Sequence, residues 1–341
     1  MRTDSGQPVR PGRRDLLRIL AVGGAAAATW KLGLLGRSGA GPVTRSRVLM
    51  GTVVNLTVVG DDRVAAESAV DATLGRMAGL EALLSRYRDD SEVARLNATG
   101  RVDNASSALL EVLRLAESVS RLGEGAFDIT IQPVLDLYRG RPSGTGPLPA
   151  PESIERALAL VGQPNLHIDG TSVTLDRTGA RITLDGIGKG YVVDRGVDTL
   201  KEHGFPDVFV EAGGDLVAGG EKGGGIPWRV GIRGPRPGLT LLAAFDARNK
   251  AVATSGDYMQ PFTEDYAQHH ILDPRTGTSA PEMASATVVA PDAATADALA
   301  TLVMVLGPRR GRELLEEQAG CEGYFVSKSL EVTRTSGFES V

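Results

Sequence analysis

The sequence of 341 residues predicts an α+β fold, in which mixed β-sheets pack against helices. The main observation is that helical and strand patterns occur along the chain without the regular alternation of a doubly wound α/β protein. The second is composition: with 42% hydrophobic and 23% charged residues, the chain can bury the core of one large domain or two smaller ones. A disordered or fibrous chain is thereby excluded.

Apolar spacing predicts the elements of the first half of the chain. The β-branched run Val48–Val59 indicates a pair of strands. Apolar side chains recur near the helical period over residues 64–84, and again over Leu109–Leu122, so each segment is expected to form a helix. The Pro- and Gly-rich segment Gly140–Pro151 has the composition of a loop.

Strand patterns dominate the second half, beginning at a hairpin turn predicted at Asp169-Gly170. Short β-branched runs predict strands at Val173–Leu175, Arg181–Leu184, Val208–Glu211, Trp228–Ile232, Leu241–Phe245, Ala251–Thr254 and Thr287–Val289. Helical periodicity predicts helices at Val192–Leu200, Thr295–Leu306 and Arg309–Gln318.

Charge and composition limit the partners of the chain. Residues 1–40 hold seven Lys or Arg and two Asp or Glu, a net charge of +5, so the remaining residues, with 30 basic and 40 acidic side chains, carry −10. Residues 41–341 are acidic enough to repel nucleic acid, and no nucleic-acid partner is expected. The single Cys321 excludes an intramolecular disulfide and a Cys-rich zinc or iron–sulfur site.

The N-terminus has the layout of an export signal. The pair Arg13-Arg14 precedes the uncharged stretch Ile19–Trp30, and the small residues Ser38-Gly39-Ala40 follow as a possible cleavage site. The apolar stretch is shorter than the roughly 20 residues that a membrane-spanning helix needs. The twin arginine resembles the signal of proteins that fold before they leave the cytoplasm.

We therefore divide the chain at residue 40. Residues 1–40 are expected to be a twin-arginine-type signal peptide or, if the apolar part extends to Leu35 and is not cleaved, an N-terminal anchor. Residues 41–341 are expected to form the catalytic domain. In both cases this domain would lie outside the cytoplasm, free in the periplasm or attached to the membrane.

A glycine-rich loop at Leu184–Tyr191 lies between a predicted strand and a predicted helix. Its three glycines let the backbone approach a ligand, the free N–H groups at the helix start attract an anion, and Lys189 adds a full positive charge. The loop does not match the P-loop or the dinucleotide fingerprint. Phosphate binding and a tight structural turn both remain open from the loop by itself.

Asp297 and Thr301 lie four residues apart on a predicted helix and share a face. A carboxylate beside a hydroxyl suits a hard cation such as Mg²⁺. The spacing by itself favours the alternative, an exposed Asp and a Thr whose hydroxyl bonds to its own helix.

The pair His269-His270 enters a Pro/Gly turn from a β-like segment. Adjacent strand residues point to opposite faces, so at most one of the two reaches a given site. Since the chain has only four histidines, zinc hydrolysis is not expected. One of the pair can act as a proton carrier, because imidazole titrates near neutral pH.

Three further segments, Gly125–Thr130, Val210–Asp215 and Ala253–Gly256, join an apolar strand to a glycine or small polar turn and so offer backbone groups to a ligand. Together with the motifs above, and in this order, they resemble one family: the ApbE family of FAD:protein FMN transferases. The resemblance covers residues 47–330. It is carried by Met50-Gly51-Thr52, Leu84–Tyr87 with Ser91-Glu92 and Asn97, Gly125–Thr130, Gly186–Tyr191 with Asp194, Gly213–Asp215, Thr254–Gly256, His270–Gly277 and Ala296–Thr301.

The resemblance implies an Mg²⁺-dependent enzyme that splits FAD, transfers the FMN half to a Thr or Ser hydroxyl of a partner protein, and releases AMP. It implies that Asp297, Thr301 and the carbonyl of Gly186 hold the metal. It implies that His270 is the base of the transfer step. Tyr87 would line the isoalloxazine ring, and the rest of the FAD cradle would be Met50, Ala126, Phe127, Asp128, Lys189 and Ile271.

Two points stay open. The family commonly has an acidic residue where Thr183 stands, whereas here Asp185 follows two places later, so either side chain can be the one that meets FAD. A water-linked carboxylate such as Asp128 can also replace His270 as the base. Chemically, Mg²⁺ and Lys189 can neutralise the charge that builds on the phosphate oxygens during transfer.

The acceptor must be a separate chain, exported or membrane-bound, because no acceptor domain is fused to this sequence. Two other functions fit the same residues. One is an FAD pyrophosphatase, in which water replaces the acceptor hydroxyl and free FMN and AMP are formed. The other is a secreted, non-catalytic flavin-binding protein, which would leave FAD intact.

Overall fold

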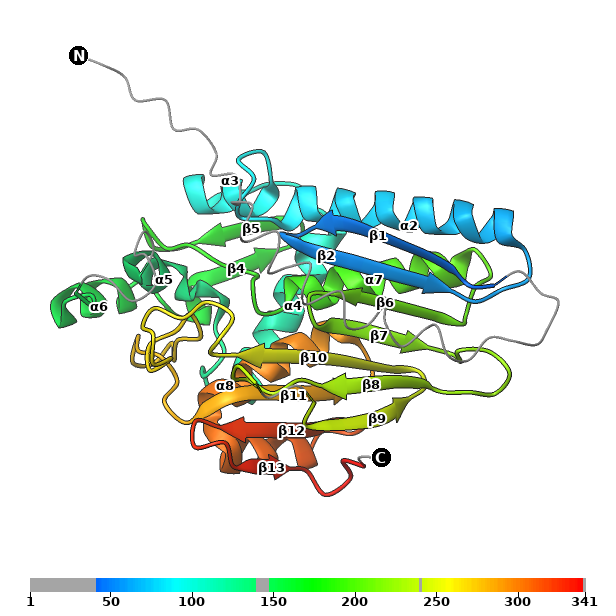
Figure 1. Cartoon of the computed structure of the whole chain (residues 1–341). Helices are drawn as coiled ribbons and strands as arrows, with labels where there is room; N and C mark the ends of the chain where they lie inside the picture. The colour runs from blue at the N-terminus through cyan, green and yellow to red at the C-terminus, as the bar shows by residue number, and fades with distance from the viewer. Residues whose placement is uncertain (1–40, 139–146, 239–240, 340–341) are drawn as a thin grey trace, which may run out of the picture.

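The computed structural model describes residues 41–138, 147–238 and 241–339. Its largest element is an eight-stranded sheet, which runs across the molecule in Figure 1. In spatial order its strands are β1 (Val43–Leu49), β2 (Thr52–Val58), β6 (Val208–Ala212), β7 (Asp215–Gly219), β10 (Lys250–Gly256), β11 (Met283–Ala290), β12 (Glu322–Ser327) and β13 (Val332–Arg334).

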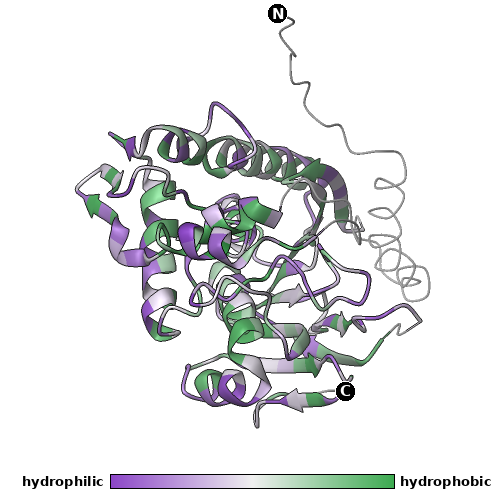
Figure 2. Cartoon of the chain, turned by 90° about the vertical axis from the view of Figure 1, so that its left-hand side faces the viewer, coloured by the Kyte–Doolittle hydropathy of each residue, from purple (hydrophilic) through white to green (hydrophobic). Residues whose placement is uncertain are grey.

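The two faces of this sheet are covered differently. Helices α2 (Arg63–Leu84), α7 (Gly188–Glu202) and α8 (Ala293–Glu316) pack on one face and enclose the larger core. The hairpin of β8 (Trp228–Ile232) and β9 (Ala243–Ala247) covers part of the other face and encloses a smaller core. The helices carry alternating hydrophobic and hydrophilic bands, as expected when one side of each is buried (Figure 2).

A smaller region lies beside the end of the sheet (Figure 1). It contains a three-stranded sheet in the order β3 (Arg101–Val102), β5 (Ser172–Leu175), β4 (Leu166–Asp169). Its helices are α3 (Glu92–Thr99), α4 (Ser107–Leu122), α5 (Gln132–Tyr138) and α6 (Pro151–Leu158), with short 3₁₀ turns at Ile129–Ile131 and Gln163–Asn165.

The predicted α+β class is confirmed, but the expectation of mixed sheets is wrong in one respect. All strand pairs in the described residues are antiparallel. For several pairs the reason is a short turn, such as Met50-Gly51 between β1 and β2 or Gly213-Gly214 between β6 and β7, because a short turn permits only antiparallel pairing.

Most predicted elements are found near their expected positions. The two long helices and the two-strand pattern of Val48–Val59 are confirmed by α2, α4 and the β1–β2 hairpin. The two helices predicted near the C-terminus are the two parts of α8, which is interrupted at Gly307, where φ is 79° and the backbone is not helical. The helix predicted at Val192–Leu200 begins four residues earlier, at Gly188.

The strand predicted at Arg181–Leu184 is wrong. The segment pairs with no strand, and its backbone bonds instead to the side chain of Asn97 and, through Thr183 N, to Ile129 O at 2.7 Å. Asn97 Nδ2 donates to Ile182 O at 2.9 Å, and Ile182 N donates to Asn97 Oδ1 at 2.7 Å. The strand predicted at Leu241–Phe245 is shifted, since β9 begins only at Ala243.

Two sequence predictions lie wholly or partly outside the described residues. These are the signal or anchor at residues 1–40 and most of the loop at Gly140–Pro151, whose last residue begins α6. Within the described part of the chain, none of the helices combines the length and hydrophobicity that crossing a membrane requires.

Candidate active site

The glycine-rich loop and the start of α7 lie directly against the first turns of α8. Gly190 N donates to Asp297 Oδ2 at 3.1 Å. A Cβ atom built on Gly186 would lie 2.9 Å from Thr301 Oγ1, so the backbone of Gly186 faces that hydroxyl. The loop therefore meets both members of the predicted metal pair.

Gly190 is required by packing. A Cβ at this position would lie 2.1 Å from the carbonyl oxygen of Ala293 and 2.8 Å from Cα of Ala294. Asp194, one turn further along α7, accepts from the N–H groups of Ala293 and Ala294 at 2.8 and 2.9 Å. Two contacts thus fix the start of α8, and with it Asp297, against α7.

The alternative reading of the Asp297 and Thr301 pair does not hold. Asp297 is only 4% exposed. Thr73 and Thr199 bond their hydroxyls to the carbonyl four residues earlier, whereas the hydroxyl of Thr301 pairs with Ser255 Oγ of β10 at 3.2 Å. Both side chains are therefore turned toward the loop and the sheet instead of solvent or their own helix.

Two further charged groups, Lys189 and Asp215, lie beside this pair. Lys189 forms an ion pair with Asp215, which is buried at the start of β7. Although burial lowers it, the carboxylates of Asp215 and Asp297 raise the pKa of Lys189 above its usual range. Burial, and the nearby Asp215 carboxylate, raise the pKa of Asp297. Two carboxylates thus share one ammonium group, an arrangement that an added cation would stabilise.

The donors fit a hard cation. Asp297 supplies a carboxylate, Thr301 a hydroxyl and Gly186 a backbone carbonyl, and oxygen is the ligand atom that Mg²⁺ prefers. In residues 41–138, 147–238 and 241–339, no three His, Cys, Asp or Glu side chains are grouped as metal ligands. A metal bound here would consequently depend on the hydroxyl and the backbone oxygen as well as on one carboxylate.

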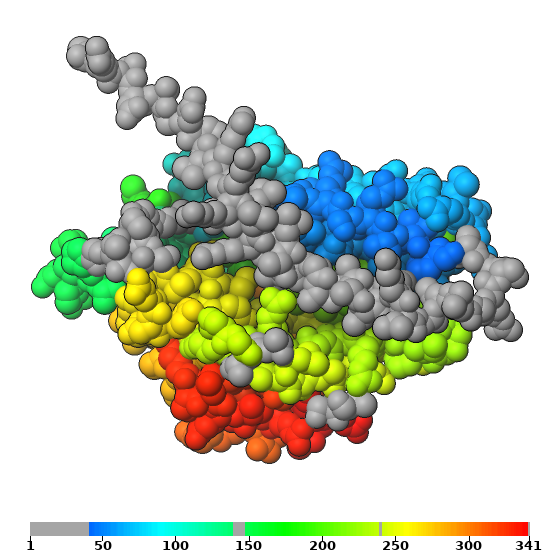
Figure 3. Space-filling view, in the orientation of Figure 1, coloured from blue at the N-terminus to red at the C-terminus, as the bar shows by residue number. Residues whose placement is uncertain are grey.

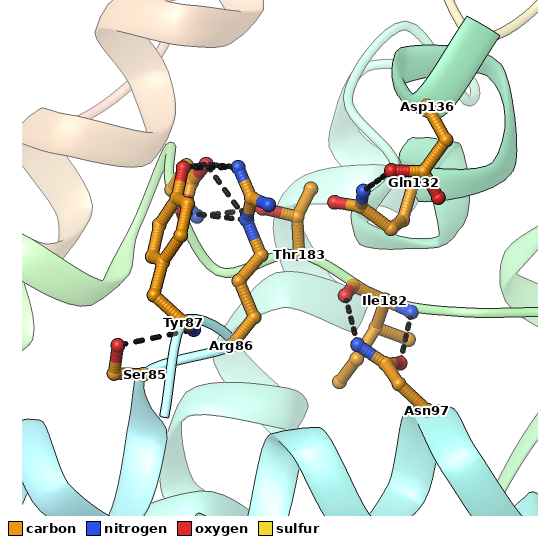
Figure 4. A network of polar contacts seen from close by, with 9 residues as sticks. Ser85, Arg86, Tyr87, Asn97, Gln132, Asp136, Ile182 and Thr183 are labelled. Carbon is orange, nitrogen blue, oxygen red and sulfur yellow. Dashed lines mark hydrogen bonds and ion pairs between the residues drawn. The ribbon is translucent and has the colours of Figure 1, made fainter. Parts of the chain in front are cut away.

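A second polar cluster surrounds Tyr87, a residue that is 67% exposed (Figure 4). The Arg86 guanidinium lies 4.0 Å from the centre of this ring and forms an ion pair with Asp185. Tyr87 OH donates to Asp185 Oδ2 at 3.1 Å. Thr183 is buried, and its hydroxyl accepts from the backbone N–H of Asp185 at 3.2 Å. Asp185 therefore contacts the aromatic side chain directly.

His270 lies at the end of a loop that folds back on itself. His270 N donates to Gln260 O at 3.1 Å, and Asp257, at the start of the loop, is held by Arg236 through two bonds of 2.7 and 2.8 Å. The yellow segment of Figure 3 that contains this loop is part of the surface, next to the yellow-green segment after β8. The charges of Asp185 and Lys189 act on His270, which connects it to both clusters above.

The two histidines differ as expected. His269 is fully buried, and its Nε2 lies 2.9 Å from Ala280 O. His270 is half-buried, and its Nδ1 has no hydrogen-bond partner among the described residues. Burial and the neighbouring His269 lower the pKa of His270 to about 4. The expectation of a titration near neutral pH is therefore wrong for this side chain, which is a neutral base at pH 7.

The remaining predicted FAD residues lie on turns. Met50 is half-buried in the β1–β2 turn, and this turn touches the Gly213-Gly214 turn before Asp215, since a Cβ on Gly213 would lie 2.6 Å from Thr52 Oγ1. Ala126, Phe127 and Asp128 are buried between α4 and α5, and Ile271 is buried after His270.

Asp128 already has protein partners on both carboxylate oxygens. Oδ1 accepts from the amide and the hydroxyl of Thr130 at 2.8 and 2.6 Å, and Oδ2 accepts from Gln163 N at 2.7 Å. This side chain therefore holds the loop in shape, and the geometry disfavours it as a replacement base.

Sequence reasoning gave no role to Arg86, Asp215 or Ser255. Each lies in a segment that was singled out, but the contacts that define their roles join residues 26 to 99 positions apart. The sequence signals that could have indicated two of these residues are the glycine turn before Asp215 and the small residues around Ser255.

Comparisons with known proteins identify the family of the chain. A sequence model of the ApbE family matches residues 50–325. The chain belongs to the ApbE family. An FAD:protein FMN transferase of Vibrio cholerae is 32% identical over 281 residues, 78% of this chain and 82% of that protein. One from Klebsiella pneumoniae is 30% identical and is aligned over 87% of this chain and 88% of its own length.

Solved ApbE structures have the same fold. The ApbE protein of Thermotoga maritima superposes with a TM-score of 0.78 at 30% identity, covering 86% of this chain and 97% of that one. The flavin transferase ApbE of Vibrio cholerae gives a TM-score of 0.75 at 29% identity, over 87% and 98% of the two chains. The region matched to the ApbE family, residues 50–325, contains every predicted site residue, from Met50 to Thr301.

Proposed function

We propose that this chain is an FAD:protein FMN transferase that requires Mg²⁺, attaches FMN to a Thr or Ser hydroxyl of a separate protein, and releases AMP. The single observation that supports this most is the meeting of Asp297, Thr301 and Gly186 beside Lys189. Membership of the ApbE family and the names of its relatives support the same reaction class.

The first requirement of the reaction is charge neutralisation at the FAD diphosphate. Bound Mg²⁺ would supply Lewis-acid stabilisation of the phosphate and leaving oxygens. Asp297, Thr301 and the Gly186 carbonyl are the residues that would hold it. Lys189 brings a second positive charge, which Asp215 keeps in position by its ion pair. An acidic protein can bind an anionic substrate when these groups surround it.

The second requirement is a base for the acceptor hydroxyl. His270 is neutral at pH 7 because burial lowers its pKa to about 4, so it can accept the proton without first losing one. The phosphoester bond then forms between the acceptor oxygen and the FMN phosphorus while the bond to the AMP oxygen breaks. Asp128 is not needed for this step, since its oxygens remain bonded to Thr130 and Gln163.

The third requirement is a place for the flavin ring. The exposed face of Tyr87 offers a stacking surface, and Asp185 and Arg86 offer an acceptor and donors at its edge. We assign contact with FAD to Asp185 and a supporting position to Thr183, because the hydroxyl of Thr183 is buried under the Asp185 backbone.

We also propose that the protein acts outside the cytoplasm on an exported or membrane-bound acceptor. This proposal rests on the sequence of residues 1–40, whose twin arginine precedes a short apolar stretch. A fold completed before export would also carry its metal and flavin sites out intact.

The experiment is to incubate the protein with FAD, MgCl₂ and total exported protein of the source cells, and then to examine a denaturing gel for flavin fluorescence. A fluorescent band other than the enzyme supports the transferase. Free FMN and AMP without a band would establish the pyrophosphatase instead. Intact FAD under all conditions would establish a binding protein, and Asp297→Asn should give that result in each assay.

A further inference from the structure

We propose that Ser255 is a positioning residue for the metal site, and that its hydroxyl orients the hydroxyl of Thr301 toward the cation. The inference rests on the metal assignment in the proposed function. It concerns an uncharged residue to which the proposed function gives no role.

The need for such a residue follows from the chemistry of a hydroxyl ligand. A threonine oxygen that gives a lone pair to a metal still carries its proton, and that proton must be donated elsewhere. In most helical positions the acceptor is the carbonyl four residues earlier, as Thr73 and Thr199 illustrate in this protein. Thr301 is instead paired with Ser255 Oγ at 3.2 Å.

The sheet places Ser255 for this purpose. Side chains alternate along β10, so that Ala251 and Ala253 belong to the core under the helices and Val252 belongs to the core under the β8–β9 hairpin. Ser255 lies on the same face of the sheet as Ala251 and Ala253, and this face is turned toward α8. Thr254 lies on the opposite face, where its hydroxyl pairs with that of Thr287 on β11 at 2.8 Å.

Neighbouring contacts leave the Thr301 hydroxyl little freedom. The backbone of Gly186 lies on one side, close enough that a Cβ there would be 2.9 Å from Thr301 Oγ1 and 3.3 Å from its Cγ2. If Thr301 donates its proton to Ser255, the lone pairs of its oxygen remain available for a cation. An oriented hydroxyl binds a cation more tightly than a freely rotating one.

The test compares Ser255→Ala with Thr254→Ala. Each variant removes one hydroxyl from β10 and breaks one hydroxyl pair, but only the first pair involves a predicted metal ligand. Cation affinity is measured by Mg²⁺ titration of the thermal unfolding midpoint and by Mn²⁺ binding in electron paramagnetic resonance. Neither measurement requires FAD or turnover.

We expect Ser255→Ala to weaken Mn²⁺ and Mg²⁺ binding by about 10-fold or more, the usual effect of losing a group that orients a metal ligand. Its unfolding midpoint in EDTA should equal that of Thr254→Ala, and Ser255→Thr, which keeps a hydroxyl, should restore binding. Equal cation affinity in Ser255→Ala and the wild type would overturn the inference. A wild-type protein that binds no cation would instead refute the metal assignment of the proposed function.

Discussion

Gly190→Ala tests whether the glycine-rich loop is built for helix packing. The added Cβ would meet the carbonyl oxygen of Ala293 at 2.1 Å, and that atom belongs to the backbone of the first turn of α8. Since ordinary carbon contacts lie at roughly 3.5 Å, α7 and α8 must separate by more than about 1 Å. Asp297, one turn into α8, moves with that turn.

The separation has two measurable effects. Overpacking of a tight contact costs about 1–3 kcal/mol, which for a domain of this size lowers the unfolding midpoint by roughly 2–4 °C per kcal/mol. A misplacement of about 1 Å at a catalytic group can lower turnover about 100-fold. The variant should therefore lose far more activity than stability.

The matched control is Gly79→Ala on α2. A Cβ there has no heavy atom within 4 Å, and the position is helical and exposed. This exchange should raise stability by roughly 0.5–1 kcal/mol, because alanine is the better helix former, and should leave FMN transfer unchanged. The assays are urea unfolding and gel fluorescence of flavinylated acceptor. Wild-type turnover in Gly190→Ala would refute the packing argument.

Three other outcomes are expected. Asp297→Asn keeps an acceptor for Gly190 N–H but loses the charge, so FAD cleavage should stop at millimolar Mg²⁺ in a folded protein; cleavage that survives, assayed by AMP release, would contradict the metal assignment. Because burial lowers the pKa of His270 to about 4, kcat/KM should be flat between pH 6 and 8 and fall as the imidazole is protonated below about pH 5, and a His270→Ala variant that keeps this acid limb would remove His270 from the mechanism. Replacing Arg13-Arg14 by two lysines should retain the protein in the cytoplasm, as fractionation would detect, whereas normal export would mean that another signal is used.

The same pKa has a consequence for stability whose sign can be worked out. In the unfolded chain a histidine takes up a proton below about pH 6.5, whereas folded His270 stays neutral down to about pH 4. Protonation therefore favours the unfolded chain between these values. The contribution of His270 to stability is fully present above pH 6.5 and is lost as the pH falls.

Elements with a strong local signal could be predicted from the sequence. The long helices α2 and α4 follow from apolar periodicity over several turns, and the break in α8 follows from the dipeptide Gly307-Pro308. Short elements such as α3, α5 and β13 were missed, because eight or fewer residues give too little periodicity. The strand predicted at Arg181–Leu184 was wrong because its backbone bonds to the side chain of Asn97 and to Ile129 O, neither of which lies on a strand.

Candidate site residues could be chosen from the sequence, but the contacts that join them could not. The spacing of Asp297 and Thr301 by itself favoured a solvent-facing pair, and only the packing of α7 on α8 shows that the carboxylate is buried. The ion pair between Lys189 and Asp215 joins two turns that no local pattern connects. The low pKa of His270 depends first on its burial, which composition does not reveal.

The order of the site residues along the chain has a consequence for biosynthesis. Tyr87 and Lys189 leave the ribosome long before α8, which supplies Asp297 and Thr301 only near the end of translation. Under the proposed function, a nascent chain that ends before α8 would carry Tyr87 and Lys189 without the proposed metal ligands. A translation product truncated before residue 301 would then be unable to cleave FAD.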